Sequence, residues 1–199
     1  MYSIVTTKSY SSPPICEKEI LRYAGFKGHD DTINDLLAQC IAETQGKLIY
    51  KVCSIVLPVH IESDLCSFGL FSLNSKKLAK NLSGCDKAII FAATIGVEID
   101  RLIGRYSRIS PSKALMFQAI GAERIEALCD LFCDEISSEL NVNTKPRFSP
   151  GYGDLALDAQ RQIFTVLDCK RKIGLTLNDS LLMSPSKSVT AIMGLCGKA

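Results

Sequence analysis

Several residue types and motifs that mark common functions are scarce or absent in this sequence of 199 residues. It has no tryptophan, two histidines, 7% aromatic residues and a formal net charge of only +2. Proteins that bind nucleic acid through phosphate contacts normally carry a large basic excess, and single-strand binders need aromatic rings for stacking. The sequence has no Cys-x-x-Cys pair, no P-loop and no Gly-x-Gly-x-x-Gly motif. It therefore argues against nucleic-acid binding, structural zinc and a standard nucleotide-binding loop.

The sequence also lacks a long apolar run. The longest, residues 88–95, contains a threonine and is much shorter than the roughly 20 residues of a membrane-spanning helix. Residues 1–12 are mostly polar and contain no apolar signal segment. We therefore expect a cytoplasmic protein with no part in a membrane.

Cysteine, in contrast, is abundant, with nine residues spread along the chain. An odd number without close pairs is unlike the disulfide framework of a small secreted protein. In a reducing cytoplasm, cysteine packs as a small apolar residue. We therefore expect most of them, including Cys40 and Cys129, to lie in the core, and the role of Cys196 stays open.

Apolar periodicity predicts an α+β fold with a mixed or antiparallel sheet flanked by helices. Ser110-Pro111 is a strong helix start, and the apolar stripe after it predicts one long helix over about 111–140. A β-branched segment, 48–61, and the apolar run 88–93 predict strands. Residues 175–183 and 188–195 predict a C-terminal β-hairpin. No repeat or low-complexity linker divides the chain, so we expect a single domain over residues 1–199.

Two further helix starts are expected from capping residues. Asp31 is suited to cap the helix that follows it, and Asp154 is suited to cap a helix over 155–167. The inward face of the long helix is predicted from its spacing. It comprises Ala114, Phe117, Gly121, Ile125, Leu128, Phe132 and Ile136.

The segment Arg147-Phe148-Ser149-Pro150-Gly151-Tyr152 offers the clearest candidate binding site. An arginine at a Pro-Gly turn can clamp a carboxylate through two parallel hydrogen bonds. Glycine lets the backbone approach a ligand, and tyrosine supplies a flat ring with a polar tip. These properties suit a ligand with a carboxylate and an aromatic ring, such as an amino-acid nucleoside. An ordinary turn before a helix would have the same composition.

Other residues allow weaker alternatives. Glu126 could bind an ammonium group or face water. Glu126, Cys129 and Cys133 share one helix face, but no histidine completes a metal site, so we expect no metal. His60 could pair with Cys53 or Cys66 as a nucleophilic dyad, which would make the protein a thiol enzyme.

Motifs in the second half of the chain resemble the activation domain of vitamin B12-dependent methionine synthase, in a free-standing form. The resemblance is clearest over residues 114–193. It consists of the Arg-x-x-Pro-Gly-Tyr motif from Arg147 to Tyr152, then Phe164-Thr165-Val166-Leu167-Asp168, and then a segment over 174–185 followed by Ser188-Val189. Ordered motifs at matching separations are more specific than a single turn.

The resemblance implies that the chain binds S-adenosylmethionine and supports the reductive methylation of an oxidised cobalamin. The cobalamin would be held by a partner, a methionine synthase or another corrinoid protein, and a flavodoxin-like protein is the candidate electron donor. The implied ligand site consists of Glu126, Arg147, Ser149, Pro150, Gly151 and Tyr152, with no catalytic side chain. In such a reaction the chain is a component of a methyltransferase system.

The sequence departs from the family in two places. The family's Asp-Trp segment has no counterpart, because the chain lacks tryptophan, and the sequence given ends soon after the predicted hairpin. We therefore expect a more open ligand site, or one completed by a partner. The alternative function is a regulatory or interaction module that binds S-adenosylmethionine without methyl transfer.

Overall fold

The computed structural model describes residues 4–27 and 30–197. Its centre is a five-stranded sheet in the order β1-β2-β6-β10-β7, in which every neighbouring pair is antiparallel. These strands are β1 (Thr6–Tyr10), β2 (Tyr50–Pro58), β6 (Lys87–Thr94), β7 (Val142–Thr144) and β10 (Ser188–Gly197). Two small antiparallel sheets consist of β3 (His60–Glu62), β4 (Leu65–Ser67) and β5 (Ser72–Asn74), and of β8 (Thr176–Leu177) and β9 (Met183–Ser184).

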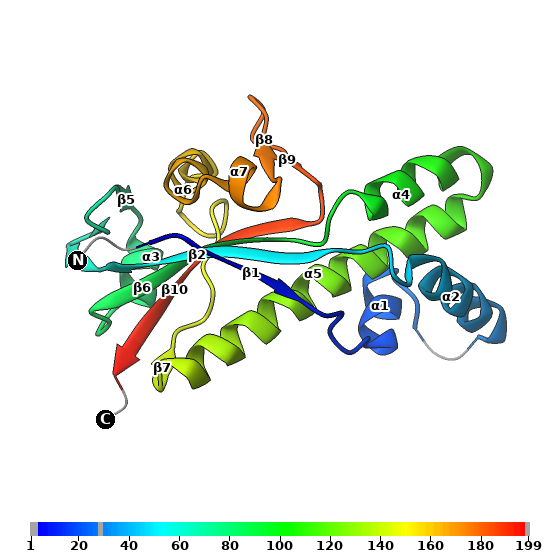
Figure 1. The fold of residues 1–199 in the computed structure, drawn as a ribbon, viewed down its shortest axis with the longest axis horizontal. Helices are drawn as coiled ribbons and strands as arrows, with labels where there is room; N and C mark the ends of the chain where they lie inside the picture. The colour runs from blue at the N-terminus through cyan, green and yellow to red at the C-terminus, as the bar shows by residue number, and fades with distance from the viewer. Residues whose placement is uncertain (1–3, 28–29, 198–199) are drawn as a thin grey trace.

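Helices cover both faces of the central sheet (Figure 1). One face packs against α1 (Glu17–Tyr23), α2 (Asp31–Thr44), α4 (Glu98–Ile109) and α5 (Pro111–Glu139). The other packs against α3 (Lys76–Asn81), α6 (Ala159–Leu167) and α7 (Cys169–Ile173). The α+β class and the antiparallel sheet are therefore as predicted.

The sheet separates two hydrophobic cores because successive side chains of a strand point to opposite faces. Strand β6 is buried on both faces, which explains its continuous apolar run. Its residues alternate between the two cores, with Ile89, Phe91 and Ala93 on the α5 side and Ala88, Ile90 and Ala92 on the α6 side.

Helix α5 agrees closely with the prediction. It begins with Pro111 at its first position and runs to Glu139. At a rise of 1.5 Å per residue, its 29 residues extend for about 43 Å. The predicted inward residues from Ala114 to Phe132 are buried, and Ile136 packs against the same core from a partly buried position.

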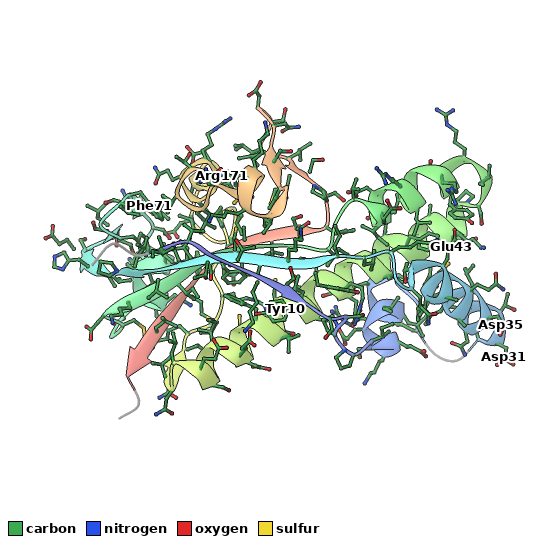
Figure 2. All side chains as sticks on the ribbon, in the orientation of Figure 1. Tyr10, Asp31, Asp35, Glu43, Phe71 and Arg171 are labelled. Atoms are coloured by element: carbon green, nitrogen blue, oxygen red, sulfur yellow. A yellow bond between two sulfur atoms is a disulfide. The ribbon has the colours of Figure 1, made fainter. Side chains whose placement is uncertain are left out.

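Polar contacts attach the outer elements to this helical layer. The Tyr10 hydroxyl donates to Glu135 of α5, and the Tyr106 hydroxyl of α4 donates to Glu43 of α2 at 3.0 Å. Figure 2 shows Tyr10 beside α5 and Glu43 beside α4. The first strand and the second helix are thus both connected to the α4–α5 pair.

The predicted C-terminal hairpin is wrong. Strand β10 pairs with β6 on one side and β7 on the other, while β8 and β9 pair only with each other. The cause is burial: β10 is apolar on both faces and occupies a central position in the sheet. The preceding segment folds on itself, since Leu181 N donates to Asn178 O and Asn178 N donates to Leu182 O.

Two helix starts also differ from the prediction. Asp30, not Asp31, caps α2, and its Oδ1 accepts from the backbone N–H groups of Thr32 and Ile33. Asp154 does not cap the helix after it, because α6 begins only at Ala159 and the chain first makes further turns. Among the described residues, no helix has the length and apolar character needed to cross a membrane.

Most cysteines are buried as expected, but not all are free. Cys40, Cys53, Cys66, Cys129 and Cys169 lie in the two cores. Cys85 and Cys196 form a disulfide, a pair that was not predicted, although the role of Cys196 had been left open. They are neighbours because Cys85 precedes β6, Cys196 lies near the end of β10, and these two strands are paired.

Candidate functional site

The Pro-Gly-Tyr segment forms a tight turn. Tyr152 N donates to Ser149 O at 3.1 Å, and Gly151 N donates to Leu155 O at 2.9 Å. Gly151 has a φ of +86°, and a Cβ at this position would lie 3.1 Å from Leu157 Cδ1. Glycine is therefore required both by the backbone conformation and by the close approach of a side chain.

Phe148 fixes this turn to the central sheet. Its side chain is buried, and its backbone exchanges two hydrogen bonds of 2.9 Å with Ile192 of β10. The Tyr152 ring contacts the Phe148 ring edge-on, with 5.3 Å between centroids, and is itself 66% exposed. The turn therefore presents an accessible tyrosine ring from a rigid base.

Arg147 reaches from the turn to helix α5. Its Nη2 lies 2.8 Å from Glu126 Oε2, and its Nη1 lies 2.7 Å from Asp130 Oδ1. Positions 126 and 130 are four residues apart and so share one face of the helix. Both terminal nitrogens of the guanidinium thus have carboxylate partners.

The charge of Arg147 is maintained by these neighbours. Partial burial by itself would lower the pKa of the guanidinium. The charged carboxylates of Asp130 and Glu126 beside it oppose the effect of burial, and the pKa lies above its ordinary value. A permanently charged arginine is suited to bind a carboxylate.

Two hollows are lined by members of this ion-pair network. The acidic hollow, about 470 Å³, lies between the Pro13–Tyr23 region and α5, and it contains the carboxylates of Glu19, Glu123, Glu126, Asp130 and Asp134. The basic hollow, about 510 Å³, is lined by Arg147, Phe148 and Tyr152 together with Lys77, Lys80, Asn81 and Pro146. Arg147 and its two carboxylate partners therefore connect surfaces of opposite charge.

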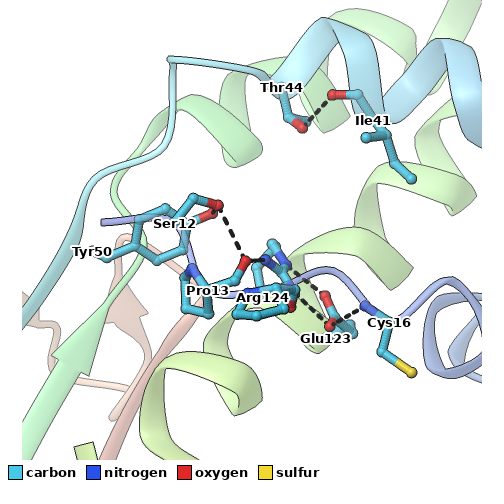
Figure 3. Close-up of polar contacts among 9 residues, drawn as sticks. Ser12, Pro13, Cys16, Ile41, Thr44, Tyr50, Glu123 and Arg124 are labelled. Atoms are coloured by element: carbon cyan, nitrogen blue, oxygen red, sulfur yellow. Dashed lines mark hydrogen bonds and ion pairs between the residues drawn. The ribbon is translucent and has the colours of Figure 1, made fainter. Parts of the chain in front are cut away.

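Glu123, which lines the acidic hollow, forms a buried ion pair with Arg124 (Figure 3). Arg124 Nε donates to Glu123 Oε2 at 2.5 Å, and both side chains are almost completely buried. Arg124 also donates to the carbonyl oxygens of Pro13 and Pro14 at 2.6 Å, and Glu123 accepts from Cys16 N at 3.0 Å. These contacts attach the Pro-Pro segment to α5.

A second contact supports the basic hollow. Asp154 accepts hydrogen bonds from the Ser75 hydroxyl and from the backbone N–H groups of Lys76 and Lys77 at the start of α3. The hydrogen bond from Ser75 is the main cause that holds the pKa of Asp154 below its ordinary value. Asp154 therefore connects the Pro-Gly-Tyr turn to α3.

Of the residues predicted for the site, the structure brings Glu126 and Arg147 into direct contact, and Arg147 and Tyr152 line the same hollow. Ser149 contributes a backbone carbonyl to the turn, and Pro150 is buried. Asp130 and the capping role of Asp154 were not predicted. The i+4 spacing from Glu126 was the available signal for Asp130, whereas the partner of Asp154 lies 79 residues away.

The geometry gives no support to a Cys–His nucleophile. His60 pairs with Ser67 across the β3–β4 ladder and Cys66 pairs with Ile61, so the histidine and the cysteine point to opposite faces. His60 is exposed and its Nε2 lies 3.1 Å from Glu62. Burial raises the pKa of the Cys66 thiol to about 11.

Cys53 is the other proposed partner of His60. It lies in the core, where its thiol contacts Cys169, and this contact and burial raise the pKa of Cys169.

Across residues 4–27 and 30–197, no group of three or more His, Cys, Asp or Glu side chains is arranged to hold a metal ion.

Comparison with known proteins gives a match in structure alone. No protein-family model and no curated protein matches the sequence. A solved structure, the MetH reactivation domain bound to AdoHcy, superposes on this chain with a TM-score of 0.68. The alignment covers 98% of this chain and 79% of the chain in that structure. The fold is that of the MetH reactivation domain.

The resemblance inferred from the sequence motifs is therefore confirmed as a likeness of fold to the MetH reactivation domain. Sequence identity is 16%, so the likeness establishes the architecture and leaves ligand and activity to be argued from the residues.

Proposed function

We propose that this chain binds S-adenosylmethionine and presents its methyl group to a corrinoid cobalt held by a partner protein. The observation that carries the proposal is the contact of Arg147 with Glu126 beside the Pro-Gly-Tyr turn. It occurs in a fold shared with the MetH reactivation domain, whose solved structure contains AdoHcy.

The paired charges are suited to an α-amino acid group. The Arg147 guanidinium would bind the methionyl carboxylate through two parallel hydrogen bonds, and Glu126 would bind the ammonium group. Both side chains come from rigid elements, since Arg147 precedes a residue bonded to β10 and Glu126 lies within α5. The exposed ring of Tyr152 would border the nucleoside or the sulfonium, to which an aromatic face is attractive.

For this reaction, the chain needs to position the methyl donor and does not need a catalytic side chain. The partner's corrinoid would supply the nucleophile, a cobalt reduced by one electron, to which the methyl group would pass with S-adenosylhomocysteine as the leaving group. A flavodoxin-like protein is the proposed electron donor, and the cytoplasm is the proposed location. The work of the chain is to hold the sulfonium at an open surface, and the exposure of Tyr152 is consistent with that task.

A second candidate function is a regulatory module that binds S-adenosylmethionine without methyl transfer. It is favoured by the absence of tryptophan, and so of the family's Asp-Trp segment, because a site that lacks one of the family's ligand contacts can bind the ligand without supporting methyl transfer.

One experiment separates these functions. The full chain is mixed with a Co(II)-corrinoid partner, a reductant and methyl-labelled S-adenosylmethionine, and label on cobalt is measured with and without the chain. Transfer that depends on the chain supports the reactivation function. Binding of the ligand in calorimetry without transfer supports the regulatory function, and absence of binding contradicts both.

A further inference from the structure

Asp130 binds one of the two terminal nitrogens of Arg147, the side chain that the proposed function assigns to the ligand carboxylate. Arg147 Nη1 lies 2.7 Å from Asp130 Oδ1 while Nη2 lies 2.8 Å from Glu126 Oε2. A ligand carboxylate that binds end-on in the two-pronged manner uses both of these nitrogens. In the free protein, the ligand carboxylate therefore cannot bind end-on unless at least one acidic side chain moves.

Exposure indicates which side chain moves. The side chain of Asp130 is 68% exposed, that of Glu126 is 44% exposed and that of Arg147 is 23% exposed. An exposed ion pair exchanges readily, because water solvates the released carboxylate. Asp130 can therefore leave for solvent while Arg147 keeps its position and Glu126 stays beside it.

We propose that Asp130 is an internal carboxylate that occupies the Arg147 fork in the free protein and is displaced by the carboxylate of the ligand. The inference rests on the proposed binding of S-adenosylmethionine and identifies a residue that lowers its affinity. Displacement exchanges one carboxylate for another, so Nη1 of Arg147 keeps a charge-assisted hydrogen bond.

The same arrangement selects a class of ligand. Glu126 and the released Asp130 both remain near the bound carboxylate, and the hollow beside them also contains Glu123 and Asp134. A simple anion meets net repulsion from these groups. A zwitterion has an ammonium group next to its carboxylate. This ammonium group can pair with Glu126 when the ligand carboxylate binds Arg147.

The test compares Asp130→Asn with the matched control Asp134→Asn. Asp134 is exposed, lies one turn further along α5 and lines the same hollow, but it makes no ion pair with Arg147. Both substitutions remove one negative charge. Asp130→Asn should tighten binding of S-adenosylmethionine in calorimetry by about two- to fivefold, the range expected for loss of an exposed competing ion pair.

The decarboxylated analogue of S-adenosylmethionine provides the second arm. It keeps the sulfonium and the ammonium group but lacks the carboxylate, so its affinity should be the same in Asp130→Asn and Asp134→Asn. A merely structural effect of the substitution would change the affinities of both ligands together.

A third measurement needs no ligand. Phenylglyoxal modifies free guanidinium groups, and mass spectrometry of the peptide that contains Arg147 measures the rate of modification at this residue. The rate should rise in Asp130→Asn relative to Asp134→Asn.

The outcomes are distinct. If the wild type, Asp130→Asn and Asp134→Asn all fail to bind S-adenosylmethionine, the proposed function is wrong. If all bind it with equal affinity, or if the rate at Arg147 is unchanged, only the role of Asp130 is overturned.

Discussion

At the scale of single residues, Arg147 carries the largest part of the proposed ligand binding. It is the one side chain in the turn that combines a permanent charge, partial burial and contact with α5. Its planar fork cannot be reproduced by lysine, whose ammonium is a point charge. Substitutions at this residue therefore test the site most directly.

Arg147→Ala should weaken binding of S-adenosylmethionine by about 2–4 kcal/mol, roughly 30- to 1000-fold, as for removal of one member of a largely desolvated charge pair. Isothermal titration calorimetry measures the change, and Arg147→Lys should recover only part of it. The distant control is Arg161→Ala, which removes an arginine of α6 that donates to the backbone carbonyl oxygen of Asp179. An unchanged dissociation constant in Arg147→Ala would exclude this residue from the site.

Thiol reactivity is a second residue-scale prediction. Burial raises the pKa values of Cys40 and Cys66 to about 11, so both thiols stay protonated and unreactive at pH 8. Among the free cysteines only Cys16 is exposed. A disulfide reagent should therefore modify Cys16 rapidly in the native protein, the partly buried Cys133 more slowly, and the buried free cysteines only after unfolding. Rapid modification of Cys66 would revive the thiol-enzyme hypothesis.

At the scale of elements, the sequence predicts what is periodic and misses what is paired at a distance. The start and inward face of α5 follow from Ser110-Pro111 and a helical repeat, and β6 follows from its apolar run. The partners of β10 do not, because its apolar residues fit a hairpin strand and a central strand equally well. Likewise, Asp154 is a good cap by type, but only the tertiary fold places it on α3.

The same contrast applies to the candidate site. Arg147 and Glu126 were predicted by motif and resemblance, and the structure places them in contact. Asp130 was missed because its i+4 spacing from Glu126 points to a shared site only once a partner from another element is known to reach that face of the helix. Side-chain pairing across elements is set by tertiary packing, which no local pattern encodes.

The cap on α3 gives a pH-dependent prediction. The pKa of Asp154 is lowered from 3.8 by the hydrogen bond from Ser75, so Asp154 stabilises the folded state above about pH 4. This stability is lost as pH falls through the lower folded-state pKa. Asp154→Asn should therefore melt at a lower temperature than wild type at pH 7, and the difference should shrink below pH 4. Asp158→Asn, at an exposed aspartate without a capping bond, is the control.

Arg124 tests the attachment of the N-terminal segment to α5. Arg124→Met leaves Glu123 buried without its ion-pair partner and removes the Arg124 donor from the carbonyls of Pro13 and Pro14. Urea denaturation should show a loss of about 3–5 kcal/mol, the usual effect of breaking a buried ion pair. The exposed pair of Arg22 with Glu19 is the comparison, and Arg22→Met should leave the midpoint unchanged. Equal effects of the two substitutions would contradict a structural role for the buried pair.

At the scale of the whole molecule, the candidate site lies where the chain passes from one face of the sheet to the other. Strand β7 follows α5, and α6 packs on the opposite core. Between them, Arg147 contacts α5 and Asp154 contacts α3, so one loop is attached to both helical layers (Figure 1). A ligand held by this loop would therefore stabilise both layers.

Ligand binding should accordingly raise the stability of the whole chain. A ligand that binds only the folded state at 100 times its Kd adds about 2.7 kcal/mol, or about 5–10 °C in Tm for a chain of this size. Differential scanning calorimetry with S-adenosylmethionine measures the shift, which should disappear in Arg147→Ala. Two separate transitions, only one of them shifted, would show that the loop does not couple the layers.

The position of β10 has a consequence for how the protein is made. This strand lies between β6 and β7 in space but follows every other strand in the chain. During synthesis, one edge of β6 therefore stays unpaired, with apolar side chains on both of its faces, until residues 188–197 leave the ribosome. Such an edge invites pairing with other chains. The inner edge of β6 is therefore protected only once the last strand of the chain is in place.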